Sequence, residues 1–175
     1  MSSSSQASEA LYLSLGSNAG DRENNIRRAL RMLEQKWDVP CDACSSLLET
    51  EPWGRWKGEA APFLNAVARF ILRPHPGLNT ADGRPALSQE AEALSLLADC
   101  KAVERALGRE EILEYDDDGE RIYHPRPIDI DLLLWGDRRI SLPALTIPHP
   151  LMDRRDFVLR PLAEIAGKDF FGKIR

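Results

Sequence analysis

The sequence has 175 residues, the size of one ordinary domain, and its 43% hydrophobic and 29% charged residues exclude a disordered chain. A net charge of −5 argues against non-specific binding of nucleic acid. The three cysteines cannot all pair, and no apolar run approaches the ~20 residues of a membrane span, so we expect a cytoplasmic protein that does not insert into membranes.

The N-terminal half predicts strands, a helix and long loops. Residues 1–9 are Ser-rich and polar, which predicts a disordered tail before a single domain over residues 10–175. Leucines alternate with other residues over 11–15, as in a half-buried strand, and Asp21 is placed to cap an amphipathic helix. The remaining elements predicted here are a strand over residues 43–50, a loop over 51–62, a strand over 63–72 and a loop over 73–87.

The C-terminal half begins with a long helix that Ser88 caps and Gly108 ends. An Asp-Gly turn predicts a hairpin within residues 111–123. Pro161 suits the first turn of a final helix that reaches Ala166. The clearest strand covers residues 128–135, with Ile128, Ile130, Leu132 and Leu134 on one face and Asp129, Asp131, Leu133 and Trp135 on the other.

The order of these elements is strand, helix, strand, strand, helix, strand. This order predicts an α+β (α/β) fold of the ferredoxin-like type, a split βαβ sandwich with an antiparallel or mixed sheet and helices on its faces. The loops over residues 51–62, 73–87 and 109–127 are long for a compact domain. Loops of this length often serve as lids or binding loops, so we expect them beside an active site.

Asp129 and Asp131 are the first candidate functional residues. At positions i and i+2 of a strand their side chains leave the same face, roughly 6.6 Å apart. The two carboxylates repel each other, and Mg²⁺ held by one or two carboxylates together with substrate phosphates would remove that repulsion. The alternative is a solvent-facing edge with two hydrated charges, which is the more common situation for an isolated Asp-x-Asp pair.

Cationic side chains surround this pair in the sequence. Arg126 lies just before it, and His149, Arg154 and Arg155 follow it. Arginines and a histidine near a metal-binding pair would neutralise the oxygens of a polyphosphate. The alternatives are surface ion pairs for the arginines and a turn position for His149.

An ordered set of motifs gives these residues a more specific meaning. It comprises LSLGSN (13–18), SSLLETEPWG (45–54), FLNA (63–66), ERALGR (104–109), PRPIDIDLL (125–133) and TIPHPLMDRRDFVLRPL (146–162). This set resembles the 6-hydroxymethyl-7,8-dihydropterin pyrophosphokinases of folate biosynthesis over nearly the whole chain. The resemblance implies a ferredoxin-like fold and the transfer of pyrophosphate from ATP to the hydroxymethyl group of the pterin, with release of AMP. We expect a monomer whose partners are these two small molecules.

The resemblance also implies roles on the nucleotide side. Asp129 and Asp131 match the aspartates that hold two Mg²⁺ ions, and Arg109 and Arg126 join them as candidate catalytic residues. Glu104 has an alternative role as the helical partner of Lys101. The residues expected to bind ATP are Lys101, Glu104, Arg126, Leu132, Thr146, His149 and Arg155.

On the pterin side, Phe63 and Phe157 match two aromatic side chains that sandwich the ring. A flat heterocycle gains stacking energy between such faces, although packing in the core is the usual role of Phe. Asn65 matches a residue that hydrogen-bonds the edge of the ring. The complete set expected to bind pterin is Thr50, Pro52, Trp53, Phe63, Asn65 and Phe157.

Two other functions remain open from the residues themselves. A non-catalytic ferredoxin-like nucleotide-binding module would not need Phe63, Asn65 and Phe157. An ordinary kinase that moves one phosphoryl group would use the same pair of aspartates, and its nucleotide product would be ADP.

Overall fold

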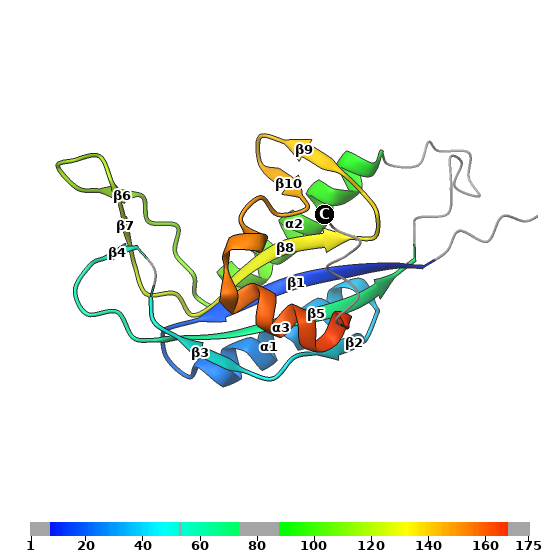
Figure 1. The fold of residues 1–175 in the computed structure, drawn as a ribbon, viewed down its shortest axis with the longest axis horizontal. Coiled ribbons are helices and arrows are strands. Elements are labelled where there is room, and N and C mark those ends of the chain that lie inside the picture. The colour runs from blue at the N-terminus through cyan, green and yellow to red at the C-terminus, as the bar shows by residue number, and fades with distance from the viewer. Residues whose placement is uncertain (1–7, 53, 74–87, 168–175) are drawn as a thin grey trace, which may run out of the picture.

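The structure, a computed structural model, describes residues 8–52, 54–73 and 88–167 (Figure 1). Its centre is a five-stranded antiparallel sheet with the order β2–β5–β1–β8, in which β3 also pairs with β5. Of the predicted tail only residues 8 and 9 are described, and Glu9 already belongs to the first strand. The bounds of the five strands are β1 (Glu9–Ser17), β2 (Cys41–Cys44), β3 (Leu48–Thr50), β5 (Phe63–Leu72) and β8 (Asp129–Trp135).

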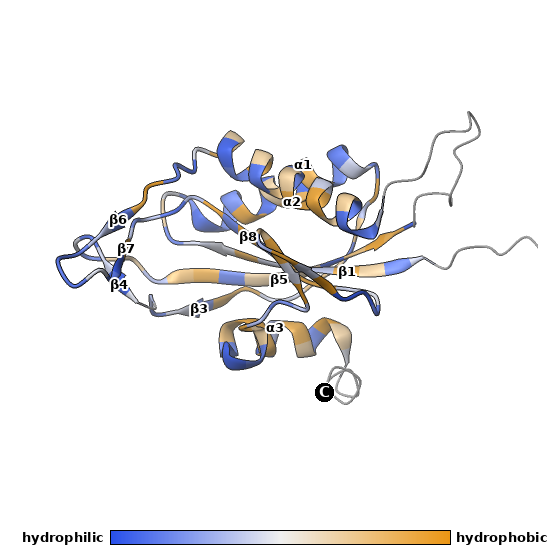
Figure 2. Cartoon of the chain, turned by 90° about the horizontal axis from the view of Figure 1, so that it is seen from above, coloured by the Kyte–Doolittle hydropathy of each residue, from blue (hydrophilic) through white to orange (hydrophobic). Residues whose placement is uncertain are grey.

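Helices cover both faces of this sheet. Figure 2 shows α1 (Arg22–Trp37) and α2 (Gln89–Ala106) on one face and α3 (Asp156–Ala166) on the other. The predicted caps of the first two helices are confirmed, since Asp21 accepts a hydrogen bond from Asn24 N at 3.1 Å and Ser88 accepts one from Ala91 N at 3.2 Å. No helix in the described part of the chain is long and apolar enough to cross a membrane. The predicted α+β sandwich is therefore confirmed.

Two smaller sheets extend this core. The strands β4 (Arg55–Trp56), β6 (Glu114–Tyr115) and β7 (Arg121–Tyr123) form a sheet at one end of the molecule, which we call the arm (Figure 1). The predicted hairpin is the β6–β7 pair, and Gly119 with a φ of 80° closes its turn. The other sheet is a hairpin of β9 (Ile140–Leu142) and β10 (Leu145–Ile147), followed by the 3₁₀ helix η1 (Met152–Arg154). Neither β4 nor this second hairpin was among the predicted elements.

The predicted strand over residues 43–50 is in fact two strands. Ser45 lies between them, and its hydroxyl oxygen accepts the hydrogen bond of Val67 N at 3.0 Å. A side chain therefore takes the place of a backbone partner in the ladder, and the strand ends there. The last helix also differs, because it begins at Asp156 and Pro161 lies within it. The buried Val158 explains the earlier start, since it packs in the core between α3 and the sheet.

The predicted alternation along β8 is wrong beyond Leu133. Leu13 pairs with Leu132 but Tyr12 pairs with Leu134, so Leu133 is an extra residue in a β-bulge. Leu134 consequently faces the core under α3, whereas Trp135 joins the core under α1 and α2. The aspartates precede the bulge and keep their common face.

Candidate active site

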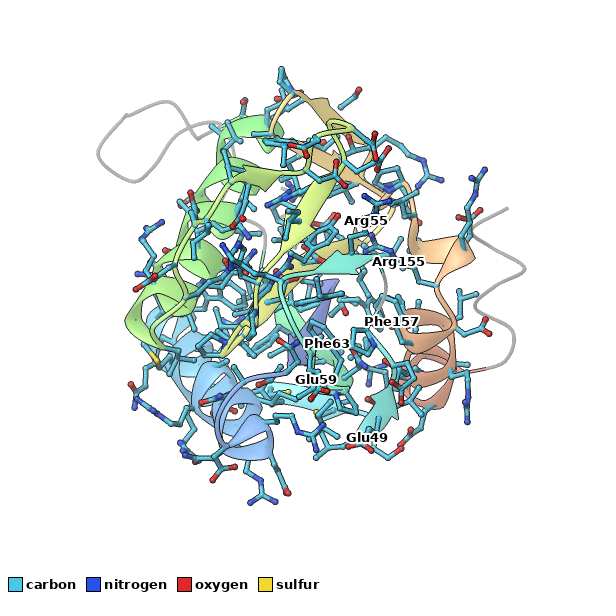
Figure 3. All side chains as sticks on the ribbon, turned by 90° about the vertical axis from the view of Figure 1, so that its left-hand side faces the viewer. Glu49, Arg55, Glu59, Phe63, Arg155 and Phe157 are labelled. Carbon is cyan, nitrogen blue, oxygen red and sulfur yellow. The ribbon has the colours of Figure 1, made fainter. Side chains whose placement is uncertain are left out.

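A pocket of about 120 Å³ opens on the α3 face of the sheet. Phe63 on β5 and Phe157 at the start of α3 both line it, and the guanidinium carbon of Arg155 lies 5.7 Å from the centre of the Phe157 ring (Figure 3). We call it the aromatic pocket. Its lining residues are Ser14, Gly16, Thr50, Glu51, Trp56, Phe63, Asn65, Tyr123, Arg126, Asp129, Arg155 and Phe157.

Gly16 and Asn65 shape the floor of the aromatic pocket. A Cβ atom at Gly16 would lie 3.3 Å from Oδ1 of Asn65 and 3.4 Å from Cδ1 of Phe63, so a larger residue would crowd the floor. The amide of Asn65 donates to Oγ1 of Thr50 at 2.9 Å and to the carbonyl of Leu48 at 3.2 Å. Both amide hydrogens are thus used within the protein, and Oδ1 is left as an acceptor.

A second pocket of about 300 Å³ lies between α2, β8 and the β9–β10 hairpin. It contains four of the residues expected to bind ATP, which are Lys101, Leu132, Thr146 and His149, together with Asp131. We call it the second pocket. The remaining lining residues are Leu97, Pro143, Ala144, Leu145 and Pro150. Arg155, by contrast, lines the aromatic pocket.

Asp129 and Asp131 connect the two pockets, because the first lines the aromatic pocket and the second lines the other. Asp129 accepts a hydrogen bond from Arg126 at 2.6 Å and is also paired with Arg109. The carboxylate of Asp131 forms no hydrogen bond or ion pair with any residue that the structure describes. Two carboxylates on one face of β8 therefore have very different surroundings.

The pKa values follow these surroundings. Burial alone would raise the pKa of Asp129, but the guanidiniums of Arg109 and Arg126 hold it below its ordinary value. Burial and the neighbouring charge of Asp129 both raise the pKa of Asp131. Burial lowers the pKa of His149, against the attraction of Asp131. The more distant charges of His149, Lys101 and Arg155 offset the rise for Asp131 only in part, so it is the less compensated of the two carboxylates and a bound cation would stabilise it most.

Backbone hydrogen bonds hold Arg126 and His149 in place beside the two aspartates. Asn18, just after β1, accepts a hydrogen bond from Arg126 N at 2.7 Å and donates its own N–H to the Arg126 carbonyl at 3.1 Å. The carbonyl of Leu133, the bulged residue, accepts a hydrogen bond from His149 N at 2.9 Å. The bulge thus fixes His149 beside Asp131 in the second pocket.

Glu104 lies beneath the site, and it lines neither pocket. Its side chain is only 2% exposed, and its carboxylate accepts the N–H of Ile130, between the two aspartates, at 2.7 Å. It also pairs with Lys101 at 2.9 Å and with Arg109 at 2.6 Å. Burial raises the pKa of Glu104 despite both cations. The observed role of Glu104 is therefore to join α2 to β8.

The structure gathers most of the predicted site residues around the two pockets. Thr50 lines the aromatic pocket, Pro52 lines neither pocket, and Trp53 lies outside the described residues. Sequence reasoning missed the aromatic side chains Trp56 and Tyr123. The available signal was the presence of two aromatic residues in loops already expected to act as lids.

The described residues include no group of three or more His, Cys, Asp or Glu side chains that could hold a metal ion. A structural zinc site would need such a group. Mg²⁺ makes a smaller demand, because one or two carboxylates suffice when phosphate oxygens and waters complete the shell. Asp129 and Asp131, the latter without an ion pair within 4.0 Å among the described residues, fit that arrangement.

Known proteins match nearly the whole chain. A family model described as 7,8-dihydro-6-hydroxymethylpterin-pyrophosphokinase (HPPK) matches residues 12–167. A 2-amino-4-hydroxy-6-hydroxymethyldihydropteridine pyrophosphokinase of Porphyromonas gingivalis is 38% identical over 157 residues, which are 89% of this chain and 90% of the relative. The enzyme of that name from Aquifex aeolicus is 36% identical over 155 residues, 89% of this chain and 79% of the relative. A folate synthesis bifunctional protein of Arabidopsis thaliana is 34% identical over 163 residues, 92% of this chain and 28% of that protein.

Proposed function

The chain belongs to the 7,8-dihydro-6-hydroxymethylpterin-pyrophosphokinase family, and we propose that its reaction takes place at the two aspartates of β8, between the aromatic pocket and the second pocket. The enzyme transfers pyrophosphate from ATP to the hydroxyl of 6-hydroxymethyl-7,8-dihydropterin and so acts in folate biosynthesis. The single observation that carries the proposal is that Asp129 lines one pocket and Asp131 the other.

The second pocket receives ATP. Lys101 and His149 lie in it beside Asp131, where they would face the phosphates. Arg126 and Arg109 each have five N–H donors, of which the pairing with Asp129 uses only a part, so both retain donors for phosphate oxygens. Two Mg²⁺ ions held by Asp129 and Asp131 would neutralise charge at the oxygen that bridges the α- and β-phosphates.

The aromatic pocket receives the pterin. Phe63 and Phe157 stack on its faces, and Oδ1 of Asn65 accepts a hydrogen bond from its edge. This placement holds the hydroxymethyl group at the Asp129 end of the pocket, where the hydroxyl oxygen can attack the β-phosphorus in line. Residues 109–127 and 51–62 close over the two substrates and exclude water before transfer.

The nucleotide product tests this function directly. The chain is incubated with Mg²⁺, ATP and 6-hydroxymethyl-7,8-dihydropterin, and the nucleotides are resolved by anion-exchange chromatography after partial reaction. AMP that increases in step with pterin diphosphate is the expected result. ADP as the sole nucleotide product would contradict it, and a parallel reaction with EDTA should give no turnover if Mg²⁺ is required.

We further propose that the enzyme is a monomer of the cytoplasm. Residues of one chain build both pockets, and Cys41, Cys44 and Cys100 are free thiols. Burial raises the pKa of Cys41 to about 11, which keeps that thiol protonated and unreactive. Light scattering after size exclusion should give a mass near 19.7 kDa, whereas twice that value would contradict a monomer.

A further inference from the structure

The arm is built from two loops that are far apart in the sequence. Its strand β4 comes from the loop over residues 51–62 and β7 comes from the loop over residues 109–127, both of which we expect beside the active site. The two strands pair in parallel, with Arg55 opposite Ile122 and Trp56 opposite Tyr123. Lys57 N also donates to the Tyr123 carbonyl at 3.0 Å. Movement of one loop must therefore move the other.

Ion pairs on both sides of Trp56 strengthen this connection. Arg55 pairs with Asp116, and Lys57 pairs with Glu114 at 2.9 Å. Both cations are well exposed, at 62% and 61%, and neither lines the aromatic pocket. They fix the backbone around Trp56 to the hairpin without reaching a substrate.

The indole of Trp56 lies at the contact between the arm and the aromatic pocket. Its ring centre is 5.5 Å from that of Phe63, at 61°, and 5.6 Å from that of Tyr123, at 34°. The guanidinium carbon of Arg126 lies 5.9 Å from the Trp56 ring and 5.1 Å from the Tyr123 ring. Arg126 in turn holds Asp129. Trp56 thus contacts Phe63 in the wall of the aromatic pocket, Tyr123 in the arm and the guanidinium of Arg126.

We propose that Trp56 is a positioning residue that joins the arm to the pterin site. Its indole holds the Phe63 ring in the orientation that stacks on the pterin, and it supports Arg126 beside Asp129. Because β4 and β7 form one sheet, the pterin wall is complete only when the arm is in place. This role rests on the proposed assignment of the aromatic pocket to the pterin.

The test compares Trp56→Ala, Trp56→Phe and the double variant Arg55→Ala/Lys57→Ala with the native chain. We expect Trp56→Ala to raise the KM for the pterin about tenfold and to lower kcat, because a ring contact is lost. The KM for ATP should rise less than the KM for the pterin, because Trp56 contacts the nucleotide site only through Arg126 and the residues of the second pocket do not belong to the arm. Trp56→Phe should restore most of the pterin affinity. The double variant should raise the pterin KM about two- to fivefold, the range expected for exposed ion pairs.

Two matched controls accompany these variants. Trp37→Phe alters a tryptophan that packs on Phe70 and lines neither the aromatic pocket nor the second pocket, and Arg27→Ala removes an exposed ion pair on α1. Neither should change either KM. Thermal unfolding of every variant shows whether the fold is intact. If Trp56→Ala unfolds, the pterin KM values of Trp56→Phe and of the double variant test the role of Trp56 instead.

The outcomes are distinguishable. A native chain that binds no pterin in calorimetry would overturn the pterin assignment of the pocket, and the role of Trp56 with it. A native chain that binds pterin, with Trp56→Ala and the double variant at native pterin KM, would overturn the role of Trp56 alone. Equal rises in the KM values for pterin and ATP would also overturn it, because they would indicate general loosening of the site.

Discussion

Asp129 and Asp131 differ in what would follow from removing their charges. Asp129 is paired with two half-buried arginines, so Asp129→Asn removes the charge that both contact and should lower the free energy of unfolding by about 1–3 kcal/mol. Asp131 has no close ion pair, and burial together with the charge of Asp129 raises its pKa, so Asp131→Asn should leave that free energy unchanged or increase it. Both variants should lose turnover. Urea unfolding at pH 7 measures the difference.

Asp153 on η1 provides a control for these substitutions, since its carboxylate is exposed and lines neither pocket. Asp153→Asn should retain both native stability and native turnover. Native turnover in Asp131→Asn would show that this carboxylate does not serve the reaction.

Phe63 and Phe157 are half-buried, and both line the aromatic pocket. Phe63→Ala and Phe157→Ala should therefore each weaken pterin binding by about 1–2 kcal/mol through lost stacking and burial, and should leave ATP binding unchanged. Titration calorimetry with each substrate measures both. If the two variants instead unfold, their rings belong to the core and not to a binding site.

Several of these residue-level roles could be predicted from the sequence because they depend on local spacing. The two aspartates share a face since a strand alternates strictly, and this held up to Leu133. The pair of Arg126 with Asp129 agrees with the ion-pair alternative raised for that arginine. The pair of Arg109 with Asp129 could not be predicted, because Arg109 approaches from a segment 20 residues away. The hydrogen bonds that the Asn65 amide donates to Thr50 and Leu48 could not be predicted either, because they depend on how β3 pairs with β5.

At the scale of elements, α2 and β8 are joined through one buried carboxylate. Glu104→Gln removes a charge that Lys101 and Arg109 both need, and should destabilise the fold by about 1–3 kcal/mol. Because Glu104 lines neither pocket, the effect on the free energy of unfolding should exceed the effect on the KM for ATP. Urea unfolding and steady-state kinetics of this variant measure the two.

The exposed Glu111, which follows α2 in the chain, gives the matched control. Glu111→Gln should leave the free energy of unfolding at its native value. A Glu104→Gln variant of native stability with a strongly raised KM for ATP would assign this carboxylate to nucleotide binding.

The elements that sequence periodicity predicted best are those with a long apolar face. The strand at 63–72 has the predicted bounds, and the caps at Asp21 and Ser88 are in place. The break at Ser45 was not predictable, because it depends on a hydroxyl replacing one partner in a ladder with a distant strand. The bulge at Leu133 was not predictable either, because it depends on the register of β8 with β1.

At the scale of the whole molecule, the arm is distinct from the core sheet (Figure 1). Replacing residues 114–121 by a short Gly-Ser turn should therefore leave thermal stability near its native value. It should lower kcat about 100-fold, because the hairpin no longer positions Tyr123 and Arg126 beside the reacting groups. Differential scanning calorimetry and steady-state kinetics measure the two effects. A large loss of thermal stability would mean that the arm is part of the core.

The arm also marks the limit of what the sequence could show. Both contributing segments were expected to be loops near the site, and the hairpin was recognised from its Asp-Gly turn. The pairing of β4 with β7 involves only two residues of each strand, too few for any periodic signal. The three-dimensional assembly alone brings Trp56 to Tyr123.

If the aromatic pocket takes the pterin as proposed, the fixed amide of Asn65 would discriminate among its ligands. Because Thr50 and Leu48 hold both of its hydrogens, the group cannot rotate to offer a donor without breaking two bonds. A flat ring that presents an N–H at this edge gains a hydrogen bond. A ring of the same shape that presents a lone pair there brings two acceptors together in a buried place, and is rejected at a cost of about 1–3 kcal/mol. The proposed site therefore predicts that, among flat rings of one shape, those with an N–H at this edge bind more tightly than those with a lone pair there.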